Sequence, residues 1–485
     1  MVFSSHIFLF YFLPLVLLLY YGAPRRGRNL LLTLLSYLFY GWANPLFVVL
    51  MFFSTVIDYF SGLVISQQWR TSWDRPVEAL SVGGERTRGQ RAAVTISICS
   101  NLALLGFFKY FNFATENYDA ILSLFGVDAM KLDLWFRITL PLGISFYTFQ
   151  SMSYSIDTYR GHAKAIRNPV DFACYVAMFP QLVAGPIIRF QEVADQLLDR
   201  LHTLERFSRG VSFLCLGMAK KVLLANPCGK IADMAFDAGT VGCLDAWYGA
   251  TAYAFQIYFD FSGYSDMAIG LGLMLGFVFP KNFDSPYRSR SITDFWRRWH
   301  LSLSTWLRDY LYVPLGGNRR GPGRTYFNLA AVMLLGGLWH GASWNFVIWG
   351  AIHGAMLGAE RMMGKKSIYR RLPTFVTVII TFVIVLFSWV FFRSPDLASS
   401  VAYCKSMLAL GPFPFDAGLI AGIIYKPYYL LTFAIAAFVV WAAPQTWDFT
   451  RKITWPKLAW ILITMSLAVT ALTTQEFNPF IYFIF

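Results

Sequence analysis

Long apolar runs recur from one end of the chain to the other, and this recurrence limits the possible folds more than any other feature. Of the 485 residues, 56% are hydrophobic and 14% are charged, whereas soluble proteins carry about 25% charged residues. Such runs indicate helices that cross a bilayer, because a helix satisfies its own backbone hydrogen bonds in lipid. The sequence therefore predicts an all-α polytopic membrane protein, with roughly 11–12 spans and some re-entrant or interfacial helices.

Arginine and lysine residues gather in the short connections between these runs, and their placement predicts an orientation. Residues 66–92 form a basic loop, and residues 280–325 form a segment rich in arginine and tryptophan. The positive-inside rule places both in the cytoplasm, with short helices expected within residues 292–312 at that face. The net charge of +14 is explained by this topology, so membrane lipids and not nucleic acid are the expected partners. We expect one integral membrane domain over residues 1–485.

Polar side chains interrupt the apolar run at residues 246–279. Asp260, Ser262, Ser265 and Asp266 all lie inside it. Because exposed polar backbone is not tolerated against lipid, this pattern predicts a broken or cavity-lining region. The alternative is a loop that dips into the lipid headgroups.

The strongest candidate for chemistry is His340, in the sequence GGLWHGASWN at residues 336–345. It lies within the apolar segment 326–360, and ionisable groups at membrane depth are functional candidates by default. The small residues around it let a backbone or a substrate approach closely. The alternative is a histidine that only hydrogen-bonds to a neighbouring helix. His353 lies 13 residues further on, roughly 220° around a straight helix, and is predicted to be structural.

A second candidate, His300, ends the sequence DFWRRWH at residues 294–300. A neutral imidazole can take a proton from a hydroxyl group as that hydroxyl attacks an acyl carbon. Arg297 and Arg298, with Trp299, are predicted to hold the phosphates of a large anionic acyl donor. The alternative for the arginines is a role in membrane topology alone.

Several other kinds of chemistry have no motif in this chain. Its six cysteines form no C-x-x-C pair, so neither a zinc site nor any other metal site is predicted. The chain also lacks H-E-x-x-H, G-x-S-x-G and a glycine-rich phosphate loop followed by lysine. Metalloprotease, hydrolase and ATPase functions are therefore not supported, and no bound cofactor is expected.

The longest motifs resemble those of a known family. Residues 294–318, which end in YLYVPLGGN, together with GLWHG at residues 337–341 closely resemble the membrane-bound O-acyltransferases. The likeness covers most of the chain and includes MVFSS at 1–5, PQLVAGPI at 180–187 and YFDFSGYSD at 258–266. It is closest to the bacterial branch that O-acetylates alginate and other exopolysaccharides. The resemblance implies a helical bundle around a transmembrane tunnel, with His340 catalytic and His300 a second active-site residue.

The same resemblance implies a function. The chain would move acetyl groups from a cytoplasmic donor, acetyl-CoA, across the bacterial inner membrane to O-acetylate an exopolysaccharide. Its partner would be an SGNH-like acetyltransferase in the periplasm or tethered to the membrane. Acylation of a lipid or a secreted protein is an alternative, and so, in a different class, is transport of an anionic solute. Transporters often show two related halves, and no such repeat is visible in this chain.

The ends of the chain carry two further predictions. The N-terminus and the tail 474–485 are both expected in the periplasm. Tyr482 supplies the only hydroxyl in the last 11 residues, and a phenol can carry an acyl group as an ester. The sequence IYF at residues 481–483 resembles a proposed acyl relay of related systems. The alternative is that these aromatic residues only anchor the tail at the membrane surface. The loop 66–92 matches no motif of the family.

Overall fold

The computed structural model describes residues 2–42, 44–68, 77–364, 369, 371–411 and 422–474. Helices make up the regular structure of these ranges, and no strand occurs in them, which confirms the all-α prediction. Five helices of this part are long and apolar enough to cross a membrane, and two shorter apolar helices cover Ile7–Gly22 and Pro427–Trp441. The predicted count of roughly 11–12 spans exceeds these five and stays a prediction.

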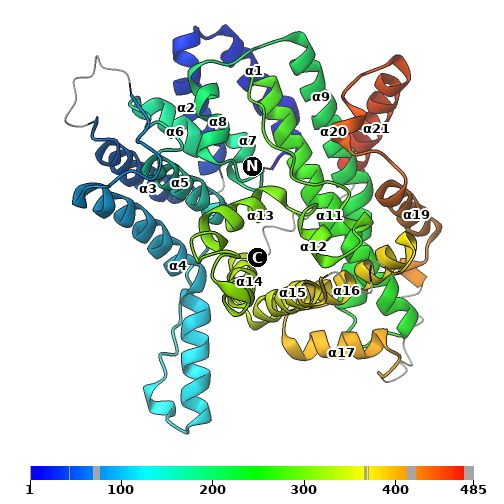
Figure 1. The fold of residues 1–485 in the computed structure, drawn as a ribbon. Coiled ribbons are helices and arrows are strands. Elements are labelled where there is room, and N and C mark those ends of the chain that lie inside the picture. Colours follow the sequence, from blue (N-terminus) through cyan, green and yellow to red (C-terminus); the bar gives the residue numbers. More distant parts are fainter. Residues whose placement is uncertain are drawn as a thin grey trace. The chain divides into compact units, whose positions relative to one another are not determined.

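The chain divides into two compact units, each described here by itself. The first unit comprises Met1–Phe207 and Leu271–Phe279, and the second comprises Ser208–Gly270 and Pro280–Phe485. Figure 1 shows the chain coloured along its sequence. His300, His340 and the predicted donor-binding residues all lie in the second unit. A candidate site can therefore be described within one unit.

The first unit contains the helices α1 to α8, which are α1 (Leu13–Gly22), α2 (Arg28–Gly41), α3 (Pro45–Ile65), α4 (Arg88–Leu124), α5 (Ile144–Arg160), α6 (Pro169–Ala177), α7 (Phe179–Leu182) and α8 (Phe190–Leu198). Helices α3 and α4 meet around the buried carboxylate of Asp58. The side chains of Ser97 and Asn101, both on α4, donate hydrogen bonds of 2.6 and 2.9 Å to it. A buried polar group held in this way ties the two helices together.

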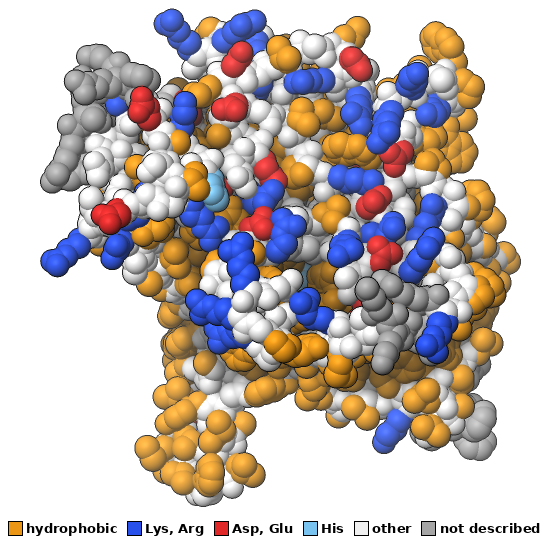
Figure 2. All heavy atoms as spheres, viewed as in Figure 1, with side chains coloured by type: hydrophobic (Ala, Val, Ile, Leu, Met, Phe, Trp, Pro, Cys, Tyr) orange, Lys and Arg blue, Asp and Glu red, His pale blue; other side chains and the backbone are white. Residues whose placement is uncertain are grey.

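Helix α4 begins earlier than predicted and is unusually long. It begins at Arg88, so the basic loop is shorter than residues 66–92, and a capping box between Thr87 and Gln90 explains this start. It continues without a break to Leu124 and is 37 residues long. Figures 1 and 2 show its far half projecting, with hydrophobic side chains on its surface. A surface of this kind indicates contact with lipid or with another protein.

The second unit contains the remaining helices. They are α9 (Leu204–Ala219), the π-helix η5 (Lys220–Ala225), α10 (Asn226–Phe236), α11 (Cys243–Met274), α12 (Ile292–Trp296), α13 (Leu301–Leu307), the π-helix η7 (Arg308–Tyr312), α14 (Gly321–His340), α15 (Trp344–Met363), α16 (Thr374–Arg393), α17 (Leu397–Met407), α19 (Pro427–Trp441), α20 (Thr446–Phe449) and α21 (Trp455–Thr474). The short helices expected within residues 292–312 are present as α12, α13 and η7. Large aromatic side chains fill the core of this unit.

Helix α11 is a single helix of 32 residues, so the region is not broken between Cys243 and Met274. The cavity-lining part of the prediction holds for Ser262, Ser265 and Asp266, which line a small pocket. The carboxylates of α11 are accommodated by lysines of η5. Lys221 Nζ lies 2.8 Å from Asp260 Oδ1, with side-chain exposures of 3% and 1%. The next pair, Lys220 with Asp266, has the same arrangement at 2.7 Å. Because each charge has its partner on a neighbouring helix, α11 needs no break.

The apolar segment 326–360 was treated as one run, but it forms two helices. Helix α14 ends at His340 and α15 begins at Trp344, with their backbones in close contact. Glycines make this approach possible. A Cβ atom on Gly337 would lie 2.2 Å from the carbonyl oxygen of Phe346, and one on Gly350 would lie 2.4 Å from that of Met333. The comparison of His340 with His353 on one straight helix therefore does not apply.

The close packing of α14 on α15 leads to a prediction. Gly337→Ala is expected to destabilise the protein by about 1–3 kcal/mol, the usual cost of overpacking, because the Phe346 backbone cannot move aside. Gly336→Ala is the matched control on the same helix, since its Cβ would meet only Leu307 Cδ1 at 3.5 Å. Thermal unfolding midpoints in detergent would compare the two variants. Equal midpoints would show that the two helices are not packed at Gly337.

Candidate functional site

His300 occupies an unusual backbone position at the start of α13. Its φ and ψ angles are +45° and +56°, and its side chain is fully buried. The segment 282–284 holds it there, since Leu301 N donates to Asn282 O and Asp284 N to Arg298 O, both at 2.9 Å. Left-handed conformations are uncommon outside glycine. They persist where the surrounding structure enforces them, often at functional sites.

The two ring nitrogens of His300 have different surroundings. Nδ1 lies 3.3 Å from the side-chain oxygen of Asn282. Nε2 is buried and has no hydrogen-bond partner among the described residues. The edge-on ring of Phe261 lies 4.6 Å from the imidazole, measured between ring centroids. Burial lowers the pKa of His300 to about 3, so the ring is neutral at physiological pH.

His340 is the last residue of α14 and is only 7% exposed. Aromatic rings surround its imidazole edge-on, with centroid distances of 5.2 Å to Trp349 and 5.3 Å to Phe392. Gly341 lets the ring of Phe346 come close, because a Cβ atom there would lie 2.0 Å from that ring. The histidine thus stands at a helix end, in apolar surroundings and next to a residue that lacks a side chain.

Trp339 connects the two predicted histidines. Its indole lies 4.9 Å from the ring of His340 and 6.1 Å from the ring of His300, between centroids. Two imidazoles from motifs 40 residues apart in the sequence therefore border one side chain. Neutral imidazoles in apolar surroundings are suited to removing or holding the proton of a hydroxyl group.

The predicted donor-binding residues are placed differently from one another. Arg297 is exposed. Arg298 forms an ion pair with Asp294, with 2.9 Å between Arg298 Nε and Asp294 Oδ1. Trp299 is 2% exposed and packs against Phe283, with ring centroids 5.1 Å apart. Its surroundings are those of a core residue, and the donor-binding role of these three residues stays a prediction.

His353, predicted to be structural, has a partner on each nitrogen. Trp296 Nε1 donates to its Nδ1 at 3.3 Å, and its Nε2 lies 3.2 Å from Ser388 Oγ. The Ser388 hydroxyl donates onward to the carbonyl oxygen of Val385 at 2.7 Å. These contacts use every hydrogen-bonding group of the ring, as a structural role requires.

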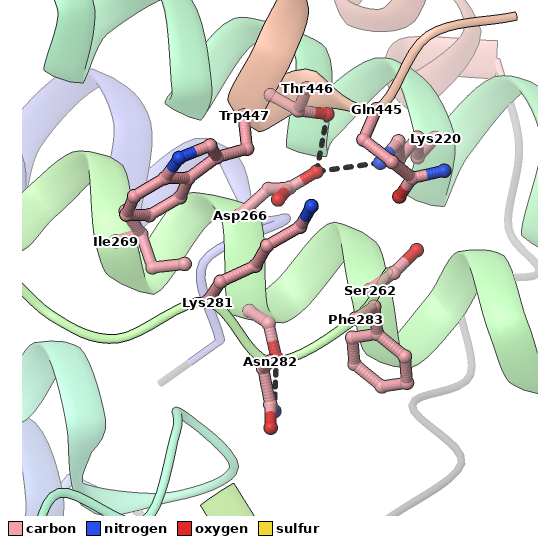
Figure 3. Close-up of a pocket in the computed structure, with 11 residues that line it drawn as sticks. Lys220, Ser262, Asp266, Ile269, Lys281, Asn282, Phe283, Gln445, Thr446 and Trp447 are labelled. Atoms are coloured by element: carbon pink, nitrogen blue, oxygen red, sulfur yellow. Dashed lines mark hydrogen bonds and ion pairs between the residues drawn. The ribbon is translucent and has the colours of Figure 1, made fainter. Parts of the chain in front are cut away.

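Asn282 is one of the residues that line a small polar pocket (Figure 3). Its volume is about 10 Å³, which is close to the space one water molecule needs. Asp266 faces it and accepts hydrogen bonds of 2.7 Å from Lys220 and from Thr446. Neither Lys220 nor Asn282 was predicted from the sequence to be functional. The adjacent lysines at 220 and 221, inside an apolar segment, were a signal for the first, whereas no local pattern marks the second.

Two further predictions concern metal binding and the C-terminal tail. Among the described residues, no three His, Cys, Asp or Glu side chains come together in a way that could hold a metal ion. Tyr482, the predicted acyl relay, lies outside the described residues, as does all of the tail 474–485 after Thr474.

Known proteins resemble the whole chain. A profile of the membrane-bound O-acyltransferase family matches residues 161–395, which include both candidate histidines. The chain is 42% identical over 518 residues to the "Probable alginate O-acetylase AlgI" of Azotobacter vinelandii, covering 100% of both chains. It is 46% identical over 440 residues to the protein of that name from Pseudomonas aeruginosa, covering 89% of this chain and 81% of the relative. It is 35% identical over 451 residues to the "Peptidoglycan O-acetyltransferase" of Helicobacter pylori, covering 84% of this chain and 80% of that one.

Proposed function

Because the chain belongs to the membrane-bound O-acyltransferase family, we propose that it moves acetyl groups from cytoplasmic acetyl-CoA across the bacterial inner membrane to O-acetylate an exopolysaccharide such as alginate. The chain is a membrane protein and an O-acyltransferase. Relatives named as O-acetylases support acetyl as the group transferred. The observation that carries the proposal is the pair of buried imidazoles, His300 and His340, beside Trp339.

The proposed reaction uses these two side chains. A hydroxyl oxygen of the acceptor forms a bond to the carbonyl carbon of the acetyl thioester, and its proton passes to His340. The carbon–sulfur bond then breaks, and the proton moves from His340 to the departing sulfur. Before the attack, the single hydrogen of this hydroxyl is donated to Nε2 of His300, which holds the acceptor in place. As the oxygen attacks, this hydrogen turns to His340 and is transferred there. Burial keeps the ring of His300 neutral before the reaction.

The proposal includes a route outward. In this proposal, both termini lie in the periplasm. The acetyl group is received by a periplasmic or membrane-tethered SGNH-like acetyltransferase. That partner passes the group to the polysaccharide. Tyr482, in the tail 474–485, is the proposed relay between the tunnel and the partner. Full polysaccharide acetylation by a Tyr482→Phe variant would show that Tyr482 is not a relay and that the tail only anchors the chain at the membrane.

The test uses purified protein in sealed vesicles, with acetyl-CoA on one side and the exopolysaccharide together with the partner acetyltransferase on the other. Release of free coenzyme A thiol together with labelled acetyl on the acceptor side is the expected result. The control supplies acetyl-CoA on the other side of the membrane, where release should stop. Movement of an anionic solute without consumption of thioester would contradict the proposal and favour a transporter.

Peptidoglycan is a second candidate acceptor, favoured by the 35% identity with the Helicobacter pylori protein. Deleting the gene and measuring ester-linked acetate separately in peptidoglycan and in exopolysaccharide distinguishes the two acceptors. Loss from exopolysaccharide alone is expected from the first proposal, whereas loss from peptidoglycan alone supports the second.

Arg297→Glu is expected to weaken acetyl-CoA binding by about 10-fold or more. A hydrogen bond to a charged group contributes about 1.5–3 kcal/mol, and reversal replaces attraction of a phosphate by repulsion. Titration of acetyl-CoA against the detergent-purified protein measures the change. Arg451→Glu is the control, since it reverses another exposed arginine of the second unit. Equally weakened acetyl-CoA binding in both variants would reflect the change in net charge alone. Unchanged binding in Arg297→Glu would show that Arg297 serves only the membrane topology.

A further inference from the structure

Asn282 is a buried side chain that touches the candidate site without being part of any motif identified in the sequence. It follows α11 and is 1% exposed. Its side-chain oxygen accepts hydrogen bonds from the backbone N–H of Ser302 at 3.2 Å and from the Ser302 hydroxyl at 2.9 Å. Its side-chain nitrogen donates to Ser265 Oγ on α11 at 3.0 Å, the contact drawn in Figure 3.

These contacts determine which way the amide faces. The oxygen and nitrogen of an asparagine side chain are assigned from their hydrogen-bond partners. A backbone N–H is a donor only, so the Asn282 atom that faces Ser302 N is the oxygen. Turning the amide over would direct its NH₂ group against that N–H. The oxygen of Asn282 therefore points towards α13, where His300 also lies.

The orientation of Asn282 in turn determines the tautomer of His300. Nδ1 of the imidazole lies 3.3 Å from the Asn282 oxygen, which carries no hydrogen, so Nδ1 must be the protonated nitrogen of a neutral ring. The second atom near Nδ1 is Ser302 Oγ at 3.4 Å, and its own hydrogen is directed to the Asn282 oxygen. The lone pair of the ring is therefore on Nε2, which is buried and has no partner among the described residues.

We propose that Asn282 is a positioning residue that holds His300 as the Nδ1–H tautomer, so that Nε2 presents its lone pair to the hydroxyl group that is acetylated. This inference rests on the proposed function. The hydroxyl donates its single hydrogen to Nε2 as the acceptor binds, and this hydrogen turns to His340 as the oxygen attacks the acetyl carbon. In the opposite tautomer, Nε2 would carry a hydrogen and would repel the hydroxyl hydrogen.

His353 provides a contrast within the same unit. There the donor Trp296 Nε1 faces Nδ1, so Nδ1 is the acceptor and Nε2 carries the hydrogen that points to Ser388. The surrounding side chains thus select opposite tautomers at the two buried histidines. At His353 both nitrogens are used within the protein, whereas at His300 the acceptor nitrogen is kept for a further partner.

The experiment measures the tautomer directly, by nitrogen NMR of the full-length protein labelled with ¹⁵N-histidine. A His300→Asn variant identifies the His300 signals. In the wild type, Nδ1 is expected to be protonated and Nε2 unprotonated. Asn282→Leu keeps the approximate size of the side chain and removes the accepting oxygen, so His300 should become a mixture of tautomers. Its kcat should fall about 10- to 100-fold, the loss seen when the partner that orients a histidine ligand is removed.

Two variants separate this role from a purely structural one. Asn282→Asp retains an accepting oxygen and should restore the wild-type tautomer. Asn328→Leu removes another buried asparagine of the second unit, whose side chain donates to Gly317 O at 3.0 Å. It should lower the thermal midpoint without changing the His300 signals. An unchanged tautomer in Asn282→Leu would overturn the inference.

If Asn282→Leu does not fold, the wild-type spectrum alone still tests the proposed tautomer of His300. A protonated Nε2 in that spectrum would overturn the inference. Failure of the proposed function has a different signature. If the tautomer responds to Asn282 as expected but no acetyl group reaches any hydroxyl, the arrangement of His300 stands and the proposed reaction is wrong. If acetyl transfer occurs and Nε2 is protonated, only the role of Asn282 is wrong.

Discussion

A His340→Ala variant is expected to insert and fold but to lose acetyl transfer by about 10²–10⁴-fold, the contribution of a general base. The loss should be this large because the His340 imidazole is the proposed proton acceptor, and alanine has no group that can accept a proton. The measurement is acetyl transfer by purified protein of confirmed folding, with the rate of coenzyme A release followed in parallel. His340→Gln, which retains more of the side-chain volume, should show the same loss.

His353→Gln is the matched control for this prediction. It also removes a buried imidazole from the second unit, but one whose nitrogens are both engaged within the protein. We expect it to lower the thermal midpoint and to keep the rate per folded molecule within a few-fold of the wild type. Near-normal transfer by folded His340→Ala would instead assign proton removal to His300.

Asp260→Leu is expected to have the largest effect on stability, about 3–5 kcal/mol, because it leaves Lys221 as an uncompensated charge in the interior. The two side chains are 2.8 Å apart and almost fully buried. Replacing both at once, as Lys221→Met with Asp260→Leu, should recover most of the loss, since an apolar pair of similar volume is often as stable as a buried ion pair. Thermal midpoints of the single and double variants measure the coupling between them.

The control for the ion pair is Glu116→Gln, which removes one partner of the exposed pair with Arg137. Exposed pairs contribute little, so its midpoint should stay close to that of the wild type. If Asp260→Leu also left the midpoint unchanged, the charges of Lys221 and Asp260 would not be buried together. If the double variant were as unstable as the single one, the loss would come from packing and not from charge.

The parts of the fold that depend on local sequence were predictable. The helical membrane class follows from apolar run length, and the short helices between residues 292 and 312 were expected where α12, α13 and η7 occur. The continuity of α11 was not predictable, because the lysines that neutralise Asp260 and Asp266 lie some 40 residues earlier in the chain. The end of α14 at His340 was missed for a similar reason, since the glycines around it signal close packing only once the partner helix is known.

The candidate site was predictable to the same extent. His300 and His340 were both identified, one from its apolar surroundings and the other from flanking arginines and tryptophans. Their common neighbour Trp339 became apparent only in three dimensions. Asn282 lies in a loop and has no periodic pattern around it, so its contact with His300 could not be anticipated. The ring of Trp299 is buried against Phe283, and its role in donor binding stays a prediction.

The left-handed backbone at His300 limits which residues evolution can place there. Most side chains are strained in this conformation, and glycine, asparagine and aspartate adopt it most readily. Sequence drift at this position should therefore be confined to a few residue types, whatever the chemistry of the site requires. An alanine substitution would change the backbone preference as well as the ring, so its effect would combine two causes. Asparagine is the replacement that removes the imidazole and keeps the chain path.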